Sequence, residues 1–240
     1  MVYVDSHCHL YEFSVKEIME YVKDTLIAAV SDDLESSRKT VKLSRKYENI
    51  VPCVGIHPWE IGSSSITEIS AIEQLIVNHG IKCLGEVGLD RKFTPETIDK
   101  QRMFFTEFLN LAKEYGLAMN IHSVNMWREV YELLLKYDIE KAVFHWYTGP
   151  LDLIDEIVSS GYYISINPAY RIQEKHRRVI DYLDLEFMVT ESDGPYEYRG
   201  LKLNPLMIKD TVNYIAQVKG VDEETVRNIV LRNFEKTFLH

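Results

Sequence analysis

The sequence predicts a single α/β domain of the TIM-type (β/α)8 barrel class. Eight short runs rich in β-branched and apolar residues alternate with longer stretches of helical periodicity, which is the pattern of repeated βαβ units. The chain has 240 residues, 46% of them hydrophobic and 27% charged, which suffices for one domain with a continuous core. We therefore expect residues 1–240 to form one barrel, with an open doubly wound sheet as the alternative.

The expected strands are six or seven residues long and are separated by polar or helical segments. In chain order they are VYVDSHC (2–8), TLIAAVS (25–31), IVPCVGI (50–56), IKCLGEV (81–87), LAMNIH (117–122), KAVFHW (141–146), YYISIN (162–167) and FMVTESD (187–193). Their number matches a closed barrel of eight strands better than an open sheet.

The clearest helix is expected at 96–115. One buried stripe is predicted there by the i, i+3, i+4, i+7 spacing of Phe105, Phe108, Leu109 and Ala112. Thr94 can cap the start, and Pro95 and Glu96 suit the first turn. Two further helices are expected at 205–218 and 222–237.

Composition limits the function classes. No run of 18 residues is free of charge, and the N-terminus lacks the basic and apolar regions of a signal peptide, so we expect a cytoplasmic protein with no membrane partner. The formal charge of -10 disfavours wide, non-specific DNA coating. Cys8, Cys53 and Cys83 lack paired spacing, so we expect small core residues rather than a disulfide framework or a thiolate zinc site.

Residues that commonly bind metal fall at the ends of five expected strands. They are His7, His9, Glu86, His122, His145 and Asp193. In a barrel these strand ends meet on one face, where active sites lie. Residues i and i+2 share a strand face, so the H-x-H pair can grip one ion together. The mixture of imidazole and carboxylate predicts a site for two divalent metal ions, zinc, manganese or magnesium, that can activate a water.

The motifs DSHCHL, GIHPW, GEVGLD, NIHS, FHWYTG and ESDGP occur in this order between about residue 5 and residue 238. In this order and spacing they resemble the TatD-related deoxyribonucleases. The resemblance implies that Glu86 bridges two metal ions. It implies that His7, His9 and Asp193 hold one ion and that His122 and His145 hold the other.

The resemblance also implies two functional roles. Asp193 would be catalytic with Glu86, accepting the proton of the attacking water, and His57 would hydrogen-bond a substrate phosphate. The sequence departs from the family pattern where many members have HCFTG, here HWYTG, and where many have arginine shortly after the strand-five histidine, here Val124 and Asn125. These departures concern recognition of the substrate phosphate and leave the metal ligands intact.

Other residues near the strand ends are candidates for binding substrate. Arg199 and Lys202 follow Asp193 and can clamp a phosphodiester. The aromatic residues that follow strands six and eight either stack on an unpaired base or pack locally: Trp146, Tyr147, Tyr196 and Tyr198. The basic segment 171–178 either edges the rim or forms a solvated helix face.

Three carboxylates have supporting roles or plain structural ones. Asp5 and Glu191 each lie two residues before an expected ligand on the same strand face. Each of the two either orients an imidazole or bonds to backbone. Asp90 follows the expected bridging glutamate and is interpreted as structural.

We interpret the chain as a metal-dependent phosphodiesterase that acts on DNA ends through a metal-activated water, with no obligate protein partner. A second hypothesis directs the same centre at a C–N or ester bond of a small molecule, which the acidic composition favours. A third, a barrel that binds metal or a partner without catalysis, predicts the loss of a ligand or of the proton-accepting carboxylate. Every one of those residues is present.

Overall fold

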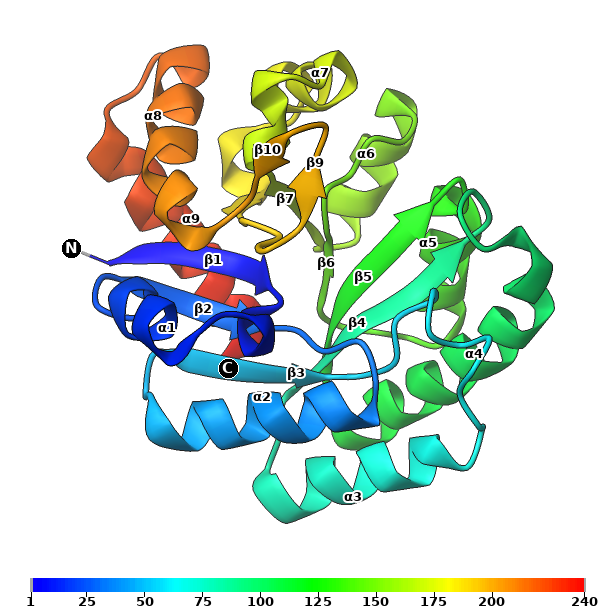
Figure 1. The fold of residues 1–240 in the computed structure, drawn as a ribbon. Helices are drawn as coiled ribbons and strands as arrows, with labels where there is room; N and C mark the ends of the chain where they lie inside the picture. The colour runs from blue at the N-terminus through cyan, green and yellow to red at the C-terminus, as the bar shows by residue number, and fades with distance from the viewer. Residues whose placement is uncertain (1, 240) are drawn as a thin grey trace.

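The computed structural model describes residues 2–239 and has eight parallel strands in one sheet, ordered β1 to β8 as in the sequence. The strands curve around a central core and the helices lie outside them (Figure 1). The strands are β1 Tyr3–Cys8, β2 Thr25–Ala29, β3 Ile50–Val54, β4 Cys83–Asp90, β5 Ala118–Val124, β6 Ala142–Phe144, β7 Tyr163–Ile166 and β8 Met188–Thr190. This confirms the predicted (β/α)8 barrel and excludes the open doubly wound sheet.

The seam between β8 and β1 is closed by individual hydrogen bonds. Within residues 2–239 no strand ladder joins these two strands. Instead the Thr190 hydroxyl donates to the Val4 carbonyl, and the Asp193 backbone N–H donates to the His7 carbonyl at 2.9 Å. The second of these bonds fixes the end of strand β8 beside the H-x-H pair.

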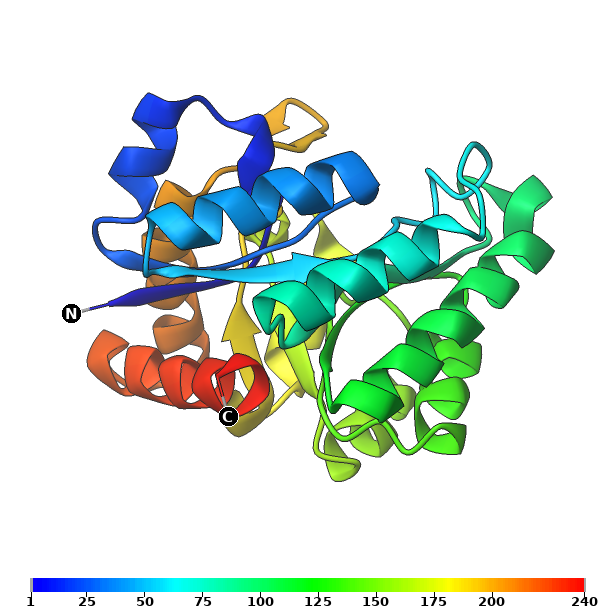
Figure 2. The same cartoon turned by 90° about the horizontal axis from the view of Figure 1, so that it is seen from below.

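The outer layer consists of helices that follow the strands. They are α1 Val15–Tyr21, α2 Leu34–Lys46, α3 Glu68–His79, α4 Ile98–Tyr115, α5 Trp127–Lys136, α6 Leu151–Ser159, α7 Glu174–Tyr182, α8 Ile208–Lys219 and α9 Glu223–Phe238. Helices α8 and α9 pack against β1 and β8 and cover the seam (Figure 2). A short hairpin, β9 Glu197–Tyr198 and β10 Leu201–Lys202, follows β8.

Helix α4 confirms the predicted stripe, because Phe105, Phe108, Leu109 and Ala112 are all at most 2% exposed. Its start differs from the prediction. Residues Pro95–Thr97 form a 3-10 turn, and Thr94 makes no side-chain cap. The side chain of Gln101 occupies this corner instead, because its amide donates to the Thr94 hydroxyl and its oxygen accepts from the Asp90 N–H. The two C-terminal helices are confirmed as α8 and α9.

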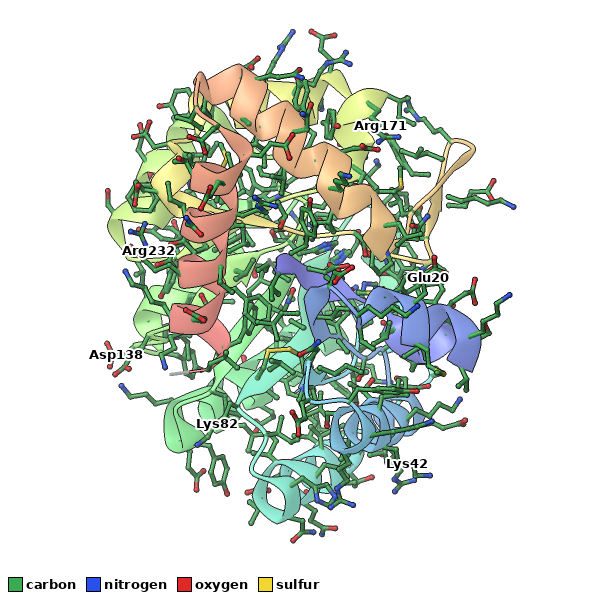
Figure 3. The ribbon with its side chains drawn as sticks, turned by 90° about the vertical axis from the view of Figure 1, so that its left-hand side faces the viewer. Glu20, Lys42, Lys82, Asp138, Arg171 and Arg232 are labelled. Atoms are coloured by element: carbon green, nitrogen blue, oxygen red, sulfur yellow. A yellow bond between two sulfur atoms is a disulfide. The ribbon has the colours of Figure 1, made fainter. Side chains whose placement is uncertain are left out.

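The cysteine prediction was partly wrong. All three cysteines are buried in the core, as expected, but Cys53 and Cys83 form a disulfide. The physical reason is register: Cys53 of β3 pairs directly with Cys83 of β4, and their Cα atoms are 4.5 Å apart. Figure 3 shows this bond inside the barrel, whereas labelled charged side chains such as Lys42 and Arg171 lie on the outside. No helix within residues 2–239 is long and apolar enough to cross a membrane.

Candidate metal centre

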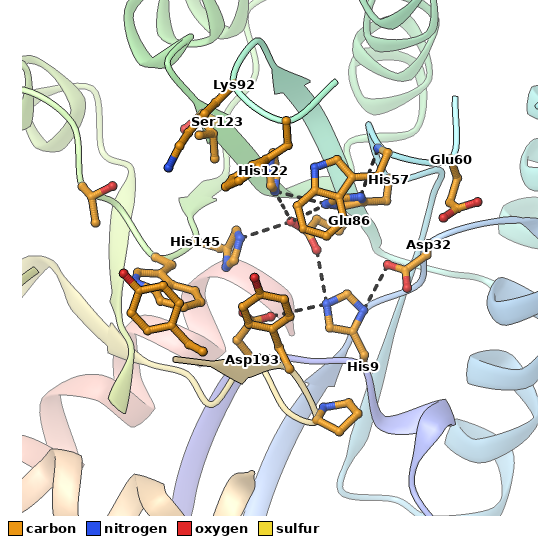
Figure 4. Close-up of a pocket in the computed structure, with 18 of the residues that line it drawn as sticks. His9, Asp32, His57, Glu60, Glu86, Lys92, His122, Ser123, His145 and Asp193 are labelled. Carbon is orange, nitrogen blue, oxygen red and sulfur yellow. Dashed lines mark hydrogen bonds and ion pairs between the residues drawn. The ribbon is translucent and has the colours of Figure 1, made fainter. Parts of the chain in front are cut away.

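The structure brings the six predicted ligands together at the C-terminal end of the barrel. His7, Glu86 and His122 lie in strands β1, β4 and β5, and His9, His145 and Asp193 follow β1, β6 and β8. All of them except His7 line a pocket of about 400 Å³ (Figure 4). His7 is fully buried. Parallel strands of a barrel end on one rim, and this is why residues up to 186 positions apart meet here.

Glu86 lies between two groups of imidazoles. Its Oε2 atom is 3.1 Å from Nε2 of His7 and 3.3 Å from Nε2 of His9. Its Oε1 atom is 2.6 Å from Nδ1 of His122 and 3.1 Å from Nε2 of His145. Nε2 of His57 is also 3.3 Å from Oε1. The two oxygens therefore face different groups of histidines, which is the geometry that a bridging carboxylate requires.

The close packing of β4 against β5 aligns Glu86 with His122. Gly88 of β4 has a φ of +150°, and a Cβ at this position would lie 1.9 Å from the His122 carbonyl oxygen. Only glycine fits such an approach. The glycine that follows Glu86 in GEVGLD therefore allows the two ligand-bearing strands to come together.

Asp193 belongs to the β1 side of the centre. Its Oδ1 atom is 3.4 Å from Nε2 of His7 and 3.4 Å from Nε2 of His9. Its backbone has a φ of 56°, in the left-handed region, where aspartate and asparagine are better tolerated than most residues. This turn points the carboxylate into the pocket directly after β8 (Figure 4).

The imidazoles of His7, His9, His122 and His145 each have an oxygen within 3.5 Å of the ring nitrogen that faces away from Glu86. Nδ1 of His7 is 2.7 Å from Asn120 Oδ1, and Nδ1 of His9 is 3.0 Å from Asp32 Oδ1. Nε2 of His122 is 3.0 Å from Asp90 Oδ2, and Nδ1 of His145 is 3.5 Å from Glu191 Oε1. The hydrogen bonds to His7 and His122 fix the orientation of these two rings, whereas Asp32 and Glu191 approach His9 and His145 as ion-pair partners.

The three supporting carboxylates, Asp5, Asp90 and Glu191, were expected either to orient an imidazole or to have a structural role, and the structure shows both roles. Glu191 and Asp90 face imidazoles, and Asp90 also accepts from the Lys92 and Phe93 N–H groups, which makes it structural as well. Asp5 instead accepts from the backbone N–H groups of His7 and Ser192, so it holds backbone rather than an imidazole. Burial raises the pKa of Asp5 to about 7.

The electrostatics of the centre keep its carboxylates ionised. Burial alone raises the pKa of Glu86, but the surrounding imidazoles of His57, His145 and His7 outweigh it and hold the pKa well below its usual value. Burial likewise raises the pKa of Asp193, and hydrogen bonds from His7 and His9 reverse the effect, so the net pKa is lowered. Ionised carboxylates only accept hydrogen bonds, and their charge attracts cations.

The residues present fit divalent cations. Ligand atoms lie within 4.8 Å of one another in several sets of three, among them His7, His145 and Asp193; His7, His9 and Glu86; and His57, Glu86 and His122. Mixed imidazole and carboxylate donors suit zinc, manganese and related first-row ions. This donor set can hold metal on both sides of Glu86.

The predicted substrate-binding residues are only partly brought to the pocket. His57 lines it, with Nε2 3.3 Å from Glu86 Oε1 and Nδ1 accepting from the Trp59 N–H at 3.2 Å. Tyr147 was a candidate for binding substrate, and the structure contradicts this role. Its side chain is fully buried, and its hydroxyl donates to the Pro150 carbonyl. Arg199 and Lys202 are exposed on the β9–β10 hairpin and do not line the pocket.

The basic segment 171–178 forms the start of α7 and the turn before it. Arg171 forms an ion pair with Asp210, and Arg178 forms one with Glu174, so both arginines are paired with carboxylates at the surface. His176 is buried and accepts from the Asn167 N–H, and burial lowers its pKa to about 4. Only Gln173 of this segment lines the pocket. The interpretation as a solvated helix face is therefore the one that the structure supports.

Several residues of the site were not identified from the sequence. Asp32 lies three residues after strand β2 and directly follows the strand expected at 25–31, so its position at a strand end was an available signal. Asn120 lies two residues before His122 on the same strand, and the period of two places both on one face. Trp59 belongs to GIHPW and donates from its indole to Asp90 at 2.8 Å. Lys92 follows β4, and no spacing rule distinguishes it.

A barrel with histidines and carboxylates converging on a pocket at its C-terminal rim is the arrangement of a metal-dependent hydrolase. A family model described as TatD related DNase matches residues 4–239. The chain therefore belongs to the TatD-related DNase family.

Individual relatives agree with this assignment. An uncharacterized metal-dependent hydrolase of Methanocaldococcus jannaschii is 31% identical, over 98% of this chain and 96% of its own length. Human deoxyribonuclease TATDN3 is 29% identical, over 98% of this chain and 94% of its own. The crystal structure of YJJV, a TatD homolog from Escherichia coli, is 21% identical and superposes with a TM-score of 0.89 over 99% of this chain and 98% of that one.

Proposed function

We propose that this chain is a phosphodiesterase that hydrolyses DNA ends with two divalent cations. The observation that carries the proposal is the position of Glu86, whose two carboxylate oxygens face two separate groups of histidines. The similarity over nearly the whole chain to human TATDN3, a deoxyribonuclease, supports the choice of DNA.

Each cation would have its own set of ligands. His7, His9 and Asp193 would hold one, His122 and His145 the other, and Glu86 would touch both. When bound, such cations lower the pKa of a water and stabilise negative charge on the phosphate. The chain itself supplies the orientation, because Asn120 and Asp90 hydrogen-bond the rings of His7 and His122. The carboxylates of Asp32 and Glu191 lie 3.0 Å and 3.5 Å from the outer ring nitrogens of His9 and His145.

Proton transfer in this scheme belongs to Asp193. Its carboxylate reaches the pocket and is ionised, so it can accept the proton of the water that attacks phosphorus. His57 lines the same pocket. Its Nδ1 atom accepts from the Trp59 N–H, so Nε2 carries the proton and can donate to a phosphate oxygen.

An aromatic wall suits an unpaired base. The ring centroids of Trp146 and Tyr198 are 5.1 Å apart, and those of Trp146 and Tyr196 are 6.1 Å apart. Gln173 holds this wall, because it accepts from the Trp146 indole at 2.8 Å and donates to the Tyr198 hydroxyl at 3.1 Å. Bases stack on such rings without sequence preference, and only unpaired bases expose a face to them. Single-stranded ends are therefore the favoured substrate.

The first test is a cleavage assay with labelled single-stranded DNA. We expect the purified protein, supplied with manganese or magnesium, to shorten the strand. We expect the rate to fall at high salt, because contacts to the DNA backbone are electrostatic. Double-stranded DNA and RNA are measured in parallel, and an Asp193→Ala variant controls for contaminating nucleases.

The second candidate is hydrolysis of a small ester or C–N bond, and the charge of the pocket favours it. Five carboxylates line the pocket, Glu12, Asp32, Glu60, Glu86 and Asp193, against one lysine. Arg199 and Lys202, which we expected to clamp DNA, lie outside the lining. Cation-dependent hydrolysis of a small ester or amide, with no nuclease activity across the cation series, would establish this second candidate.

A further inference from the structure

The pocket contains one positive side chain that the centre does not use. Lys92 is the only lysine or arginine among the described residues that line the pocket. It is exposed, and within residues 2–239 it pairs with no carboxylate. Its ammonium group lies 4.5 Å from the centroid of the neighbouring Phe93 ring. A lysine held in a pocket lined by five carboxylates, but paired with none, remains available to an anion from outside.

A hydroxyl without a partner lies in the same part of the pocket. Ser123 lines it, is 4% exposed, and its Oγ atom is buried without a hydrogen-bond partner. Leaving a buried polar group unpaired is unfavourable, so a ligand that accepts a hydrogen bond from this hydroxyl is stabilised by it. Rotation about χ1 is the only movement that a serine needs to redirect its hydroxyl.

The two side chains come from neighbouring strands. Ser123 of β5 pairs with Leu89 of β4, and β4 ends one residue later, two residues before Lys92. Figure 4 shows Lys92 and Ser123 on the far side of His122 from His9 and Asp193. The Lys92 N–H donates to Asp90, whose carboxylate faces Nε2 of His122, while Nδ1 of the same ring faces Glu86. The Asp90 carboxylate and the His122 ring therefore separate the Lys92 backbone from Glu86.

Aromatic rings adjoin this position. Trp59 and Phe93 line the pocket with ring centroids 5.6 Å apart, and they are 41% and 54% exposed. The Trp59 ring is fixed by its hydrogen bond to Asp90. An ammonium group and a hydroxyl donor beside exposed rings match an anionic group attached to a nucleoside better than they match an apolar group.

We propose that Lys92 and Ser123 form an anion subsite for a second phosphate of the substrate, distinct from the phosphate that is hydrolysed. The inference rests on the proposed function, because a chain of nucleotides carries such a phosphate and a small ester does not. Val124 and Asn125, which follow Ser123, carry no charge. Lys92 supplies a positive charge at the neighbouring strand end.

The test compares two ligands that are not phosphodiesters. Thymidine 5′-monophosphate has one phosphate and thymidine 3′,5′-bisphosphate has two, and calorimetry gives the dissociation constant of each with the cation-loaded protein. We expect the wild type to bind the bisphosphate about tenfold more tightly, the size of a charge-assisted hydrogen bond. Lys92→Met should abolish this advantage, Ser123→Ala should reduce it, and added salt should weaken it.

A matched control removes a lysine elsewhere. Lys42 is exposed on helix α2, outside the pocket, and forms no ion pair within residues 2–239, so Lys42→Met should keep the full bisphosphate advantage. If Lys92→Met and the wild type show the same preference for the bisphosphate over the monophosphate, the proposed subsite is wrong. Lys92-dependent binding of citrate without a bisphosphate advantage also overturns it, since the group recognised is then a carboxylate. A bisphosphate advantage in a protein that cleaves no DNA leaves the subsite standing and removes only the proposed nuclease activity.

Discussion

Replacement of Asp193 by asparagine should lower turnover by roughly 10²–10⁴-fold, the range for lost general acid–base catalysis. Asparagine keeps the size of the side chain and one oxygen ligand, but it cannot accept the proton of the attacking water. It also tolerates the left-handed backbone at this position, where φ is 56°, so the fold should be retained. Steady-state kinetics across a series of cation concentrations measure the effect.

The control for this variant separates proton transfer from metal binding. His9→Ala removes a candidate ligand, Nε2 of which is 3.3 Å from Glu86 Oε2, and leaves Asp193 in place. We expect its activity to recover in part when the cation is raised, whereas the Asp193→Asn variant should not recover. Restoration of Asp193→Asn to near wild-type turnover by added cation would mean that Asp193 is only a ligand.

Replacement of Glu86 by alanine should remove metal occupancy and activity together. Glu86 is 2% exposed and its two oxygens lie within 3.3 Å of nitrogen atoms from five histidines, His7, His9, His57, His122 and His145. Its loss removes the negative charge that these imidazoles share. A bridging ligand contributes to both ions, so both should be lost. Elemental analysis and activity assays of the same preparation measure this.

The fold of the Glu86→Ala variant must be checked separately. The barrel core consists of apolar residues around and between the strands, so we expect the circular dichroism spectrum to be retained. Glu107→Ala, at an exposed position of helix α4 outside the pocket, is the matched control and should keep both metal and activity. Full metal occupancy in Glu86→Ala would exclude the bridging role.

Most of the metal centre was predictable because barrel topology turns positions at strand ends into neighbours. His7, His122 and Glu86 lie on strands, where the period of two determines which side chains share a face. Once the strands are in order, their carboxyl ends meet on one rim. The convergence of these three residues therefore follows from the strand pattern, and His9, His145 and Asp193 lie only one to three residues beyond a strand end.

Residues beyond the strand ends were predicted less well, because no periodicity governs them. Trp146 has a φ of 38°, and this turn leaves Trp146 in the pocket wall while Tyr147 enters the core. Arg199 and Lys202 lie on a hairpin that the sequence did not predict. The disulfide depends on the register of β3 against β4, which aligns Cys53 with Cys83 and which the spacing of the cysteines along the chain does not specify.

Anomalous diffraction from crystals soaked in a manganese salt tests the two-cation centre most directly. We expect two peaks at the C-terminal end of the barrel, one beside His7 and His9 and one beside His122 and His145, with the Glu86 carboxylate between them. Each peak should lie about 2.0–2.2 Å from the nearest ligand atoms, as for first-row ions bound by imidazole and carboxylate. A single peak, or two peaks of which only one touches Glu86, would contradict the account.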